Sequence, residues 1–397
     1  MKRYLLLAPL VCLLSCTTTP KSASDAPMGG EPTQALALDL NQSLSGQPVA
    51  HAISYSGYRE GQAPGGKSPS YAEIKEDLGL IAQNFNLIRL YGADAMGSTI
   101  LEVIQKEKLP LKVMQGVWLR AELNNPKCPW GKPVSAAELE ANRKLNLEEV
   151  ERVITLTRQY PSLITAISVG NEALVEWTDH LVPVASVISY VKRIREGTRA
   201  TGQLLTVAEN YVPWTKGEDE LVATLDFLTI HTYPIWEHKS LKESMPFTLE
   251  NYHGVLKRYP NKPVAIGEAG WTTGSDGINI PRAIANETNQ KIYYDDLRAW
   301  TQKEKIVAFI FEAFDEPWKG GPSADEPEKH WGLYTVDRKP KLVMCESYAA
   351  HSPEQKAIAA TVPSCNPKTL GAPAADQSKT PLKPEVKAKA KAKTKAK

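Results

Sequence analysis

The sequence predicts an eight-stranded parallel β/α barrel, and three observations lead to this fold class. Between about residue 50 and residue 351, short apolar runs alternate with amphipathic stretches, the pattern of repeated β/α units around a parallel sheet. The apolar runs number eight, which is the number that closes such a barrel. A doubly wound open sheet, the main alternative, needs a Gly-rich phosphate turn after its first strand, whereas here Gly57 is followed by Tyr58-Arg59-Glu60.

Each predicted strand is a short apolar run with little polar alternation, typical of parallel strands that are covered on both faces. In the seventh run, Val264-Ala265-Ile266 leads through Gly267, which leaves room beside the next side chain, to Glu268. This strand therefore ends in a carboxylate. The eight runs cover residues 52–57, 86–91, 111–119, 164–170, 204–208, 227–232, 263–267 and 306–312.

Amphipathic stretches between these runs predict the helices that cover the barrel. The clearest one places apolar residues from Val184 to Ile194 on one face, opposite Lys192, Arg193 and Arg195. The other predicted helices cover residues 71–84, 145–159, 248–259 and 292–303, and a last one near 342–350 closes the set.

The N-terminal segment predicts export. Residues 1–16 carry two basic residues, an apolar run too short to span a bilayer, and Leu13-Leu14-Ser15-Cys16. This fits a lipoprotein-type signal, so we expect a protein lipid-anchored through Cys16 to a bacterial membrane of the cell envelope; an uncleaved anchor or plain secretion is the alternative. Residues 17–48, rich in Thr, Ser, Pro, Gly and Ala, predict a flexible tether.

The barrel domain is predicted to span residues 49–351, followed by a disordered Pro/Ala/Lys-rich tail over 352–397. Residues 379–397 hold eight Lys and one Glu and carry +7, which leaves −5 for the rest of a chain whose net charge is +2. We therefore expect no nucleic-acid binding by the folded domain. The tail is either a solvated extension or a docking arm for an anionic envelope polymer or lipid.

Cysteine and histidine spacing gives no sign of a metal site, because neither a Cys-x-x-Cys nor a His-Glu-x-x-His pattern is present. We expect no cofactor and no metal. In an exported protein Cys345 and Cys365 are able to form a bridge that ties the tail to the last helix, which would leave Cys128 over. The sequence leaves this pairing open.

Two glutamates stand at the predicted carboxyl ends of strands on opposite sides of the barrel, where active sites of this fold lie. Glu172 follows the fourth strand and Glu268 the seventh, so their side chains are expected to face each other across the opening. Retaining cleavage of a glycosidic bond needs one protonated carboxyl and one ionised carboxylate about 5 Å apart. The pair predicts this chemistry; two ion-paired structural glutamates are the alternative.

Four motifs carry a family resemblance over nearly the whole predicted barrel. Ser168-Val-Gly-Asn-Glu172, Ile266-Gly-Glu-Ala-Gly-Trp271, Phe311-Glu-Ala-Phe-Asp-Glu-Pro-Trp318 and Lys329-His-Trp-Gly-Leu333 resemble glycoside hydrolase family 17, in its fungal and bacterial branch, which also has a His-Thr-Tyr-Pro motif like that at His231. The resemblance implies action on β-1,3-glucan with retention, by hydrolysis or by transfer to another sugar. We expect a monomer whose partners are the glucan and, through the anchor, the membrane.

Carried over by position, the resemblance makes Glu172 the general acid and base and Glu268 the nucleophile. Asn171 is expected to hold the sugar 2-hydroxyl. Arg89 and Tyr233 are expected to donate to the Glu268 carboxylate and keep it ionised, while a more apolar setting keeps Glu172 protonated.

Further substrate contacts are expected from Tyr91 and Glu312, and from Trp271 and Trp331 as stacking surfaces, for which core packing is an equal alternative. Asp315 and Glu316 are interpreted as structural, and His231 as a hydrogen-bonded barrel residue rather than a base. After the nucleophile, Ala269 and Thr272 depart from the commoner pattern of the family. They remove no reacting group and place only the fine subsite geometry in question.

Two other readings remain. A related barrel enzyme of the same clan would cut β-1,4 or mixed-linkage glucans, and the strand-eight motif argues against it. A non-catalytic carbohydrate-binding lipoprotein on the same scaffold is the second reading. The presence of both carboxylates argues against that reading, because a retired site would tolerate the loss of either.

Overall fold

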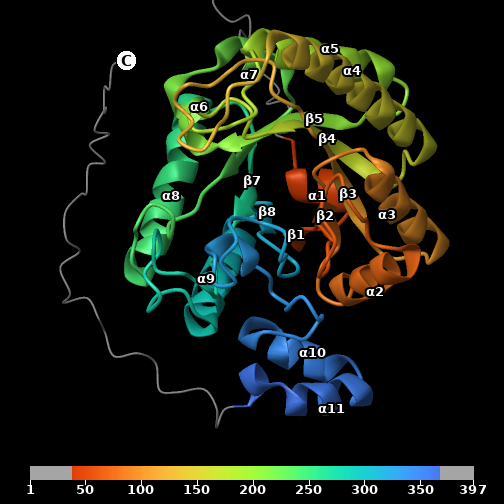
Figure 1. Ribbon diagram of the computed structural model, residues 1–397. Coiled ribbons are helices and arrows are strands. Elements are labelled where there is room, and N and C mark those ends of the chain that lie inside the picture. The colour runs from red at the N-terminus through yellow and green to blue at the C-terminus, as the bar shows by residue number, and fades with distance from the viewer. Residues whose placement is uncertain (1–37, 367–397) are drawn as a thin grey trace, which may run out of the picture. The chain divides into compact units, whose positions relative to one another are not determined.

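The computed structural model describes residues 38–366, which form a closed barrel of eight parallel strands (Figure 1). Each strand pairs with the next one along the chain, and β8 closes the ring against β1. All eight predicted strands are confirmed, with ends that differ by a few residues. They are β1 (Ala52–Ser54), β2 (Leu87–Arg89), β3 (Lys112–Val117), β4 (Ile164–Asn171), β5 (Leu204–Asn210), β6 (Leu228–His231), β7 (Val264–Ala269) and β8 (Ala308–Ile310).

Helices surround the barrel, as the amphipathic pattern indicates. The predicted helices between strands are present as α2 (Tyr71–Ile81), α4 (Ala136–Gln159), α5 (Val184–Gly197), α8 (Leu241–Arg258) and α9 (Glu287–Glu304). Three further helices were not predicted: α3 (Ala95–Lys106), α6 (Tyr211–Lys216) and α7 (Asp219–Thr224). The Asp94 carboxylate caps α3 by accepting from the Gly97 amide at 3.0 Å.

A short helix, α1 (Leu40–Ser45), covers the amino-terminal end of the barrel. Leu44 is fully buried among residues from the beginnings of the strands, including Phe227 and Phe309. Asn41 fixes the helix, since its amide donates to the Lys305 carbonyl at 2.6 Å and accepts from the Ala50 amide at 2.8 Å. The tether prediction is therefore wrong for residues 38–48, whose apolar residues are too few to form a pattern in sequence but fill the bottom of the barrel.

The folded part of the chain also extends beyond the C-terminal boundary predicted at residue 351. Beyond α10 (Cys345–His351), the chain forms α11 (Pro353–Thr361) and the short 3-10 helix η3 (Pro363–Cys365), and α10 and α11 lie side by side in Figure 1. A disulfide joins Cys345 to Cys365, so the bridge left open by the sequence is present. The tail predicted from residue 352 is wrong up to Asn366, because the disulfide and the short helix α11 hold that stretch.

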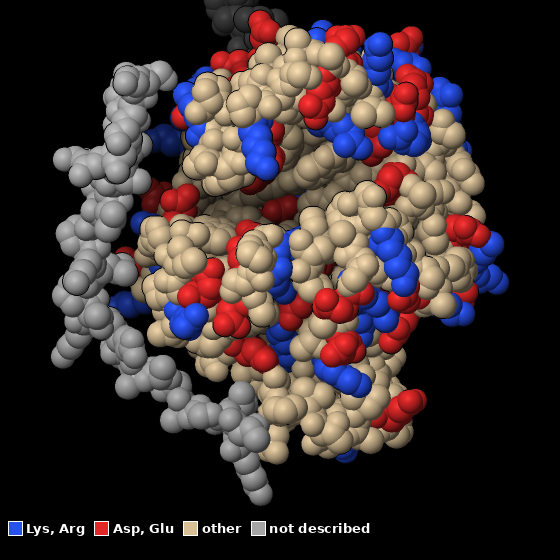
Figure 2. Space-filling view, viewed as in Figure 1, with Lys and Arg blue, Asp and Glu red and all other residues tan. Residues whose placement is uncertain are grey.

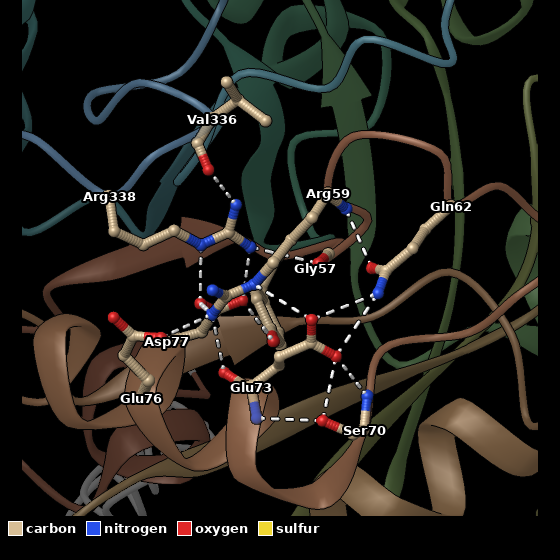
Figure 3. Close-up of polar contacts among 10 residues, drawn as sticks. Gly57, Arg59, Gln62, Ser70, Glu73, Glu76, Asp77, Val336 and Arg338 are labelled. Carbon is tan, nitrogen blue, oxygen red and sulfur yellow. Dashed lines mark hydrogen bonds and ion pairs between the residues drawn. The ribbon is translucent and has the colours of Figure 1, made fainter.

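A buried polar network joins the first and last parts of the barrel (Figure 3). The Asp77 carboxylate in α2 accepts hydrogen bonds from two nitrogens of Arg338, Nε at 2.7 Å and Nη2 at 2.6 Å. It accepts a third from Nη2 of Arg59 at 2.8 Å. Arg338 follows β8 in the chain, and its Nη2 also donates to the Gly57 carbonyl after β1 at 3.0 Å. A buried carboxylate is stable only when it is paired in this way, so the network fixes the seam between β8 and β1.

The predicted signal, the lipidated Cys16, the tether up to residue 37 and the tail from residue 367 lie outside the described residues. Within residues 38–366, no helix has the length and apolar character needed to cross a membrane, and no cluster of candidate metal ligands occurs. Figure 2 shows acidic and basic side chains interspersed on the face that it draws, with a groove across the middle of that face.

Candidate active site

The carboxyl end of β4 is distorted so that two consecutive side chains serve the same site. Gly170 has φ +93° and Glu172 has φ +46°, and the pairing of β4 with β5 shifts register between Ser168 and Asn171. Side chains of a regular strand alternate between its two faces. The irregular turn instead lets Asn171 contact Arg89 of β2 while Glu172 contacts His231 of β6. A left-handed conformation at a glutamate is strained, a feature that clusters at functional sites.

Glu268, at the end of β7, is surrounded by donors. On Oε1, Nη1 of Arg89 lies at 2.5 Å and the Tyr91 hydroxyl at 2.9 Å. On Oε2, the Tyr233 hydroxyl lies at 2.6 Å and Nδ1 of His231 at 3.5 Å. The side chain is 8% exposed. Gly267 is required here because a Cβ would lie 2.4 Å from Thr229 and 3.2 Å from the His231 ring.

These donors decide the charge of Glu268. Burial alone would raise the pKa of its carboxyl, but His231, Arg89 and Tyr233 outweigh burial and bring the pKa down to about 2. The two donors expected from the sequence, Arg89 and Tyr233, are thus present. Tyr91, expected to contact substrate, instead donates to the same carboxylate. Glu268 is therefore ionised at neutral pH.

Glu172 and Glu268 both lie next to His231. Its Oε1 lies 3.0 Å from Nδ1 of His231, and Oε2 of Glu268 lies 3.5 Å from the same nitrogen. The two carboxylate oxygens are therefore no more than about 6.5 Å apart. This upper bound lies at the lower end of the range of about 6.5–9.5 Å that separates the carboxyl groups of inverting enzymes. Glu172 is 26% exposed, so the apolar setting expected around it is wrong: it contacts an imidazole and solvent.

Asn171 is oriented by Arg89. Nη2 of Arg89 lies 2.6 Å from Oδ1 of Asn171, and a guanidinium only donates, so the amide oxygen faces Arg89. The amide NH₂ group is left to point elsewhere as a donor. One arginine therefore holds both the Glu268 carboxylate and the amide of Asn171 in place.

The tryptophans expected as stacking surfaces are part of the core. Trp271 is 1% exposed and donates from Nε1 to the Ile284 carbonyl at 2.8 Å. Trp331 is 0% exposed and packs against Tyr233 and Phe311. Neither ring offers an open face to a sugar, so core packing, the alternative, describes both. The sequence could not separate the two outcomes, because both tryptophans belong to the motifs of the family resemblance and their burial depends on residues distant in the chain.

An exposed aromatic surface lies elsewhere at the opening. Trp118, directly after β3, is 37% exposed, and its ring lies 4.9 Å from that of His180 with a tilt of 31°. Nε2 of His180 is in turn 2.9 Å from the Asn171 carbonyl oxygen. Neither Trp118 nor its neighbour His180 was proposed as a substrate contact from the sequence. Neither residue belongs to a motif, so only their position in the fold reveals them.

The acidic residues after β8 are internally paired. Glu312, expected to contact substrate, is buried and its Oε2 lies 2.6 Å from Nζ of Lys319, which also pairs with Glu316 at 2.7 Å. Asp315 pairs with Lys341 at 2.7 Å. These ion pairs support the structural interpretation of Asp315 and Glu316. Oε1 of Glu312 has no hydrogen-bond partner among the described residues, so its substrate contact stays a prediction.

Glu328 is a further acidic residue near the pair that sequence reasoning missed. It lies in the 3-10 helix η1 (Pro327–Lys329), directly before the Lys329-His330-Trp331 motif, and that proximity was the available signal. Burial, followed by the neighbouring Glu326, Glu268 and Glu172, raises its pKa to about 7, against an opposing contribution from Lys319. Glu328 is thus close enough to both catalytic candidates to sense their charge.

Comparison with known proteins decides the family. The BtgE/BtgC glycoside hydrolase domain matches residues 52–332, which include every strand of the barrel and both facing glutamates. The chain belongs to this glycoside hydrolase family. The expected class of enzyme is therefore confirmed.

Related sequences belong to the same group of enzymes. The glucan 1,3-β-glucosidase of Arthroderma benhamiae is 26% identical over 325 residues, which cover 76% of this chain and 94% of that protein. The probable glucan endo-1,3-β-glucosidase btgC of Aspergillus terreus is 26% identical over 294 residues, 69% of this chain but only 41% of that protein.

Solved structures with the same fold include two glucan-active enzymes. An endo-laminarinase from Formosa Hel1_33_131 superposes with a TM-score of 0.68 at 26% identity and covers 80% of this chain and 89% of that one. The family 17 β-1,3-glucanosyltransferase from Rhizomucor miehei, at 22% identity and a TM-score of 0.58 over 76% of this chain and 96% of that one, shares the fold. An active-site mutant of the latter was solved with laminaritriose.

Proposed function

We propose that this BtgE/BtgC-type glycoside hydrolase is a retaining enzyme that acts on β-1,3-glucan, by hydrolysis or by transfer to an acceptor sugar, and that it belongs to glycoside hydrolase family 17. The observation that carries the proposal is the ionised Glu268, with four donors around it, facing Glu172 within about 6.5 Å across His231. The names of the Arthroderma and Formosa relatives support the choice of substrate.

In the first step, Glu268 is the nucleophile. Its carboxylate bonds to the anomeric carbon while the bond from that carbon to the leaving oxygen breaks and Glu172 gives its proton to that oxygen. A glycosyl ester on Glu268 and a carboxylate on Glu172 result. Arg89 and the two tyrosines hold Glu268 ionised and fixed in direction, so the attack needs little rearrangement.

In the second step, Glu172 is the base. It takes the proton of a water molecule or of an acceptor sugar hydroxyl while that oxygen bonds to the anomeric carbon and the ester bond breaks. Two inversions at one carbon give retention. Whether water or sugar is the acceptor depends on binding beyond the reacting ring.

Two groups are suited to hold the sugar. The NH₂ group of Asn171, freed by Arg89 on its other side, is placed to donate to the 2-hydroxyl, a contact that strengthens in the transition state. Trp118 supplies an exposed aromatic face beside Asn171, supported by His180, and such a face suits the C–H side of a pyranose.

The experiment follows product lengths when the full chain is incubated with linear β-1,3-gluco-oligosaccharides. Shorter products indicate hydrolysis, and products longer than the substrate indicate transfer. Retention is checked by the anomer that forms first. Glu268→Ala should abolish turnover in a folded protein, whereas Glu60→Gln, an exposed carboxylate on the loop after β1, should leave it unchanged. Cleavage of β-1,4-glucan in preference to β-1,3-glucan would overturn the proposed substrate.

We further propose that the protein is exported and lipid-anchored through Cys16 in a bacterial envelope. The Leu-Leu-Ser-Cys sequence at residues 13–16 supports this, and the Cys345–Cys365 disulfide suits an oxidising compartment. Cys16→Ser should abolish incorporation of labelled fatty acid and release the protein from membranes. Unchanged labelling of that variant would exclude Cys16 as the modified residue.

A further inference from the structure

A fully buried carboxyl that the proposed reaction does not use lies beside the turn that carries Glu172. Glu209 is the second-last residue of β5 and is 0% exposed. Its Oε1 accepts a hydrogen bond from the Leu174 amide at 3.0 Å, whereas its Oε2 has no hydrogen-bond partner among the described residues. A buried carboxyl with one oxygen unpaired costs stability, so stability alone does not account for an acid at this position.

The end of β4 contains one more residue than the strand beside it. From one paired position to the next, β4 advances three residues, from Ser168 to Asn171, while β5 advances two, from Thr206 to Ala208. An extra residue of this kind re-aims the side chains that follow it. Glu172, with φ +46°, comes directly after this irregularity, so its direction depends on how the turn is held.

Two hydrogen bonds from consecutive residues of β5 hold the turn. The Glu172 amide donates to the Ala208 carbonyl at 2.9 Å, and two residues later the Leu174 amide donates to the Glu209 carboxyl. A left-handed conformation at a glutamate persists only where the surrounding contacts fix it. Without the Glu209 carboxyl, the turn would lose the hydrogen bond that ties residue 174 to β5.

The Glu209 carboxyl also lies close enough to Glu172 to sense its charge. Burial, followed by the charge of Glu172, raises the pKa of Glu209 well above its usual value, and Glu218, directly before α7, acts in the same direction. Two backbone amides of the turn oppose the rise. The Glu172 carboxylate itself lies 3.0 Å from Nδ1 of His231. Its side chain is thus oriented from β6 and its backbone from β5.

We propose that Glu209 is a positioning residue whose carboxyl holds the turn after β4 so that Glu172 reaches the glycosidic oxygen, and that it acts on the reaction through Glu172. The inference rests on the proposed function and adds a residue that lies behind the acid. Glu268 is held by donors at the ends of β2 and β6, and Asn171 by Arg89. Loss of the Glu209 carboxyl should therefore slow proton transfer and leave the attack by Glu268 intact.

Two substrates separate an effect on the acid from an effect on the nucleophile. A β-1,3-gluco-oligosaccharide has a sugar as its leaving group, which needs the proton of Glu172. The 2,4-dinitrophenyl β-glycoside of the β-1,3 disaccharide releases dinitrophenolate, a stable anion that leaves without a proton. The value of kcat/KM on the second substrate reports the attack by Glu268, and the ratio of the two values reports the acid.

The variants remove or keep the acceptor for the Leu174 amide. Glu209→Leu removes it at nearly constant size, and Glu209→Gln keeps an oxygen there. Asp77→Asn, which alters a buried carboxylate at the seam between β8 and β1, is the matched control. Circular dichroism and thermal unfolding first show that each variant is folded. If Glu209→Leu does not fold, Glu209→Asp, whose carboxyl is one methylene shorter, takes its place in the same comparison.

Glu209→Leu should lower kcat/KM on the oligosaccharide roughly 100-fold, a contribution typical of a positioned acid, and leave kcat/KM on the dinitrophenyl glycoside close to the wild-type value. Glu209→Gln should restore most of the rate on the oligosaccharide, and Asp77→Asn should keep the wild-type ratio. An equal loss on both substrates, no loss on either, or no recovery in Glu209→Gln would overturn the proposal. If the wild-type protein cleaves neither substrate, the proposed function fails and this inference fails with it.

Sodium azide tests the second step, in which Glu172 is the base. Azide is already an anion, so it bonds to the anomeric carbon without giving up a proton while the ester bond to Glu268 breaks, and a β-glycosyl azide forms. Azide should therefore raise kcat of Glu209→Leu on the dinitrophenyl glycoside and leave kcat of the wild type nearly unchanged. Absence of the glycosyl azide from the variant's products would contradict the proposal.

Discussion

The hydroxyl oxygen of Tyr233 lies 2.6 Å from Oε2 of Glu268, across the boundary between adjacent strands. Tyr233 follows His231 by two residues, so both side chains face the same way, as they do along an extended chain. The His-Thr-Tyr sequence therefore delivers two donors from β6 to the carboxylates of β4 and β7. Arg89 and Tyr91, also two residues apart, do the same from β2 to the other oxygen of Glu268.

Removing the Tyr233 hydroxyl should raise the pKa of Glu268 and slow turnover. Tyr233→Phe keeps the ring packed against Trp331 and Phe311 but removes one donor from Glu268. We expect kcat to fall by roughly 10²-fold and the acid limb of kcat/KM to move to higher pH, because that donor helps to lower the pKa of Glu268. Tyr252→Phe, which alters a tyrosine on α8 instead, should leave both quantities as in the wild type.

Stability in acid should depend on Glu268. Its pKa is about 2 in the folded protein against a usual value of 4.5, so the stabilisation is fully present above pH 4.5 and is lost as pH falls toward 2. The difference corresponds to about 3 kcal/mol. Urea unfolding at a series of pH values should show this loss in the wild type, and a smaller one in Glu268→Gln. If the free energy of unfolding fell equally with pH in the two proteins between pH 4.5 and 2, the loss would not come from Glu268.

The Asp77 network should be a major source of stability. Asp77→Ala leaves the buried guanidinium of Arg338 without its partner and should cost about 3–5 kcal/mol, measured by chemical denaturation. Arg59→Ala removes a partly exposed partner of the same carboxylate and should cost about 1 kcal/mol or less. The double variant Asp77→Ala/Arg338→Met should recover part of the loss. If Asp77→Ala and Arg59→Ala lowered the free energy of unfolding equally, the buried pair of Asp77 and Arg338 would contribute no more than the partly exposed one.

Trp118, and not the buried tryptophans, should contribute to sugar binding. In a Glu172→Gln background, Trp118→Ala should weaken binding of a β-1,3-gluco-oligosaccharide about tenfold, equivalent to about 1.4 kcal/mol, by calorimetry. Trp130→Ala, another exposed tryptophan, is the control and should bind normally. Trp271→Phe should act on thermal stability instead, because the indole bonds to the Ile284 carbonyl in the core. Unchanged affinity in Trp118→Ala would remove this residue from the site.

Much of the fold was readable from the sequence because the strands are local features. Each buried strand must be apolar on both faces, and eight such runs with helical stretches between them have few ways to close. The boundaries at both ends were misjudged for a complementary reason. Leu44 and the Cys345–Cys365 pair are held by contacts with residues that are distant in the chain, and local composition does not record such contacts.

The sequence by itself determined the barrel, the placement of Glu172 and Glu268 at the carboxyl ends of two different strands, and the donors Arg89 and Tyr233. Each of these depends on which residue stands at or just after the carboxyl end of a strand. The tertiary structure alone decided which neighbours are available to a substrate. Trp271, Trp331 and Glu312 belong to sequence motifs as Glu268 does, yet packing buries the two indoles and Lys319 pairs with Oε2 of Glu312. It also decided that one nitrogen of His231 stands between the carboxylates of Glu172 and Glu268, because that position depends on the register of β4, β6 and β7 together.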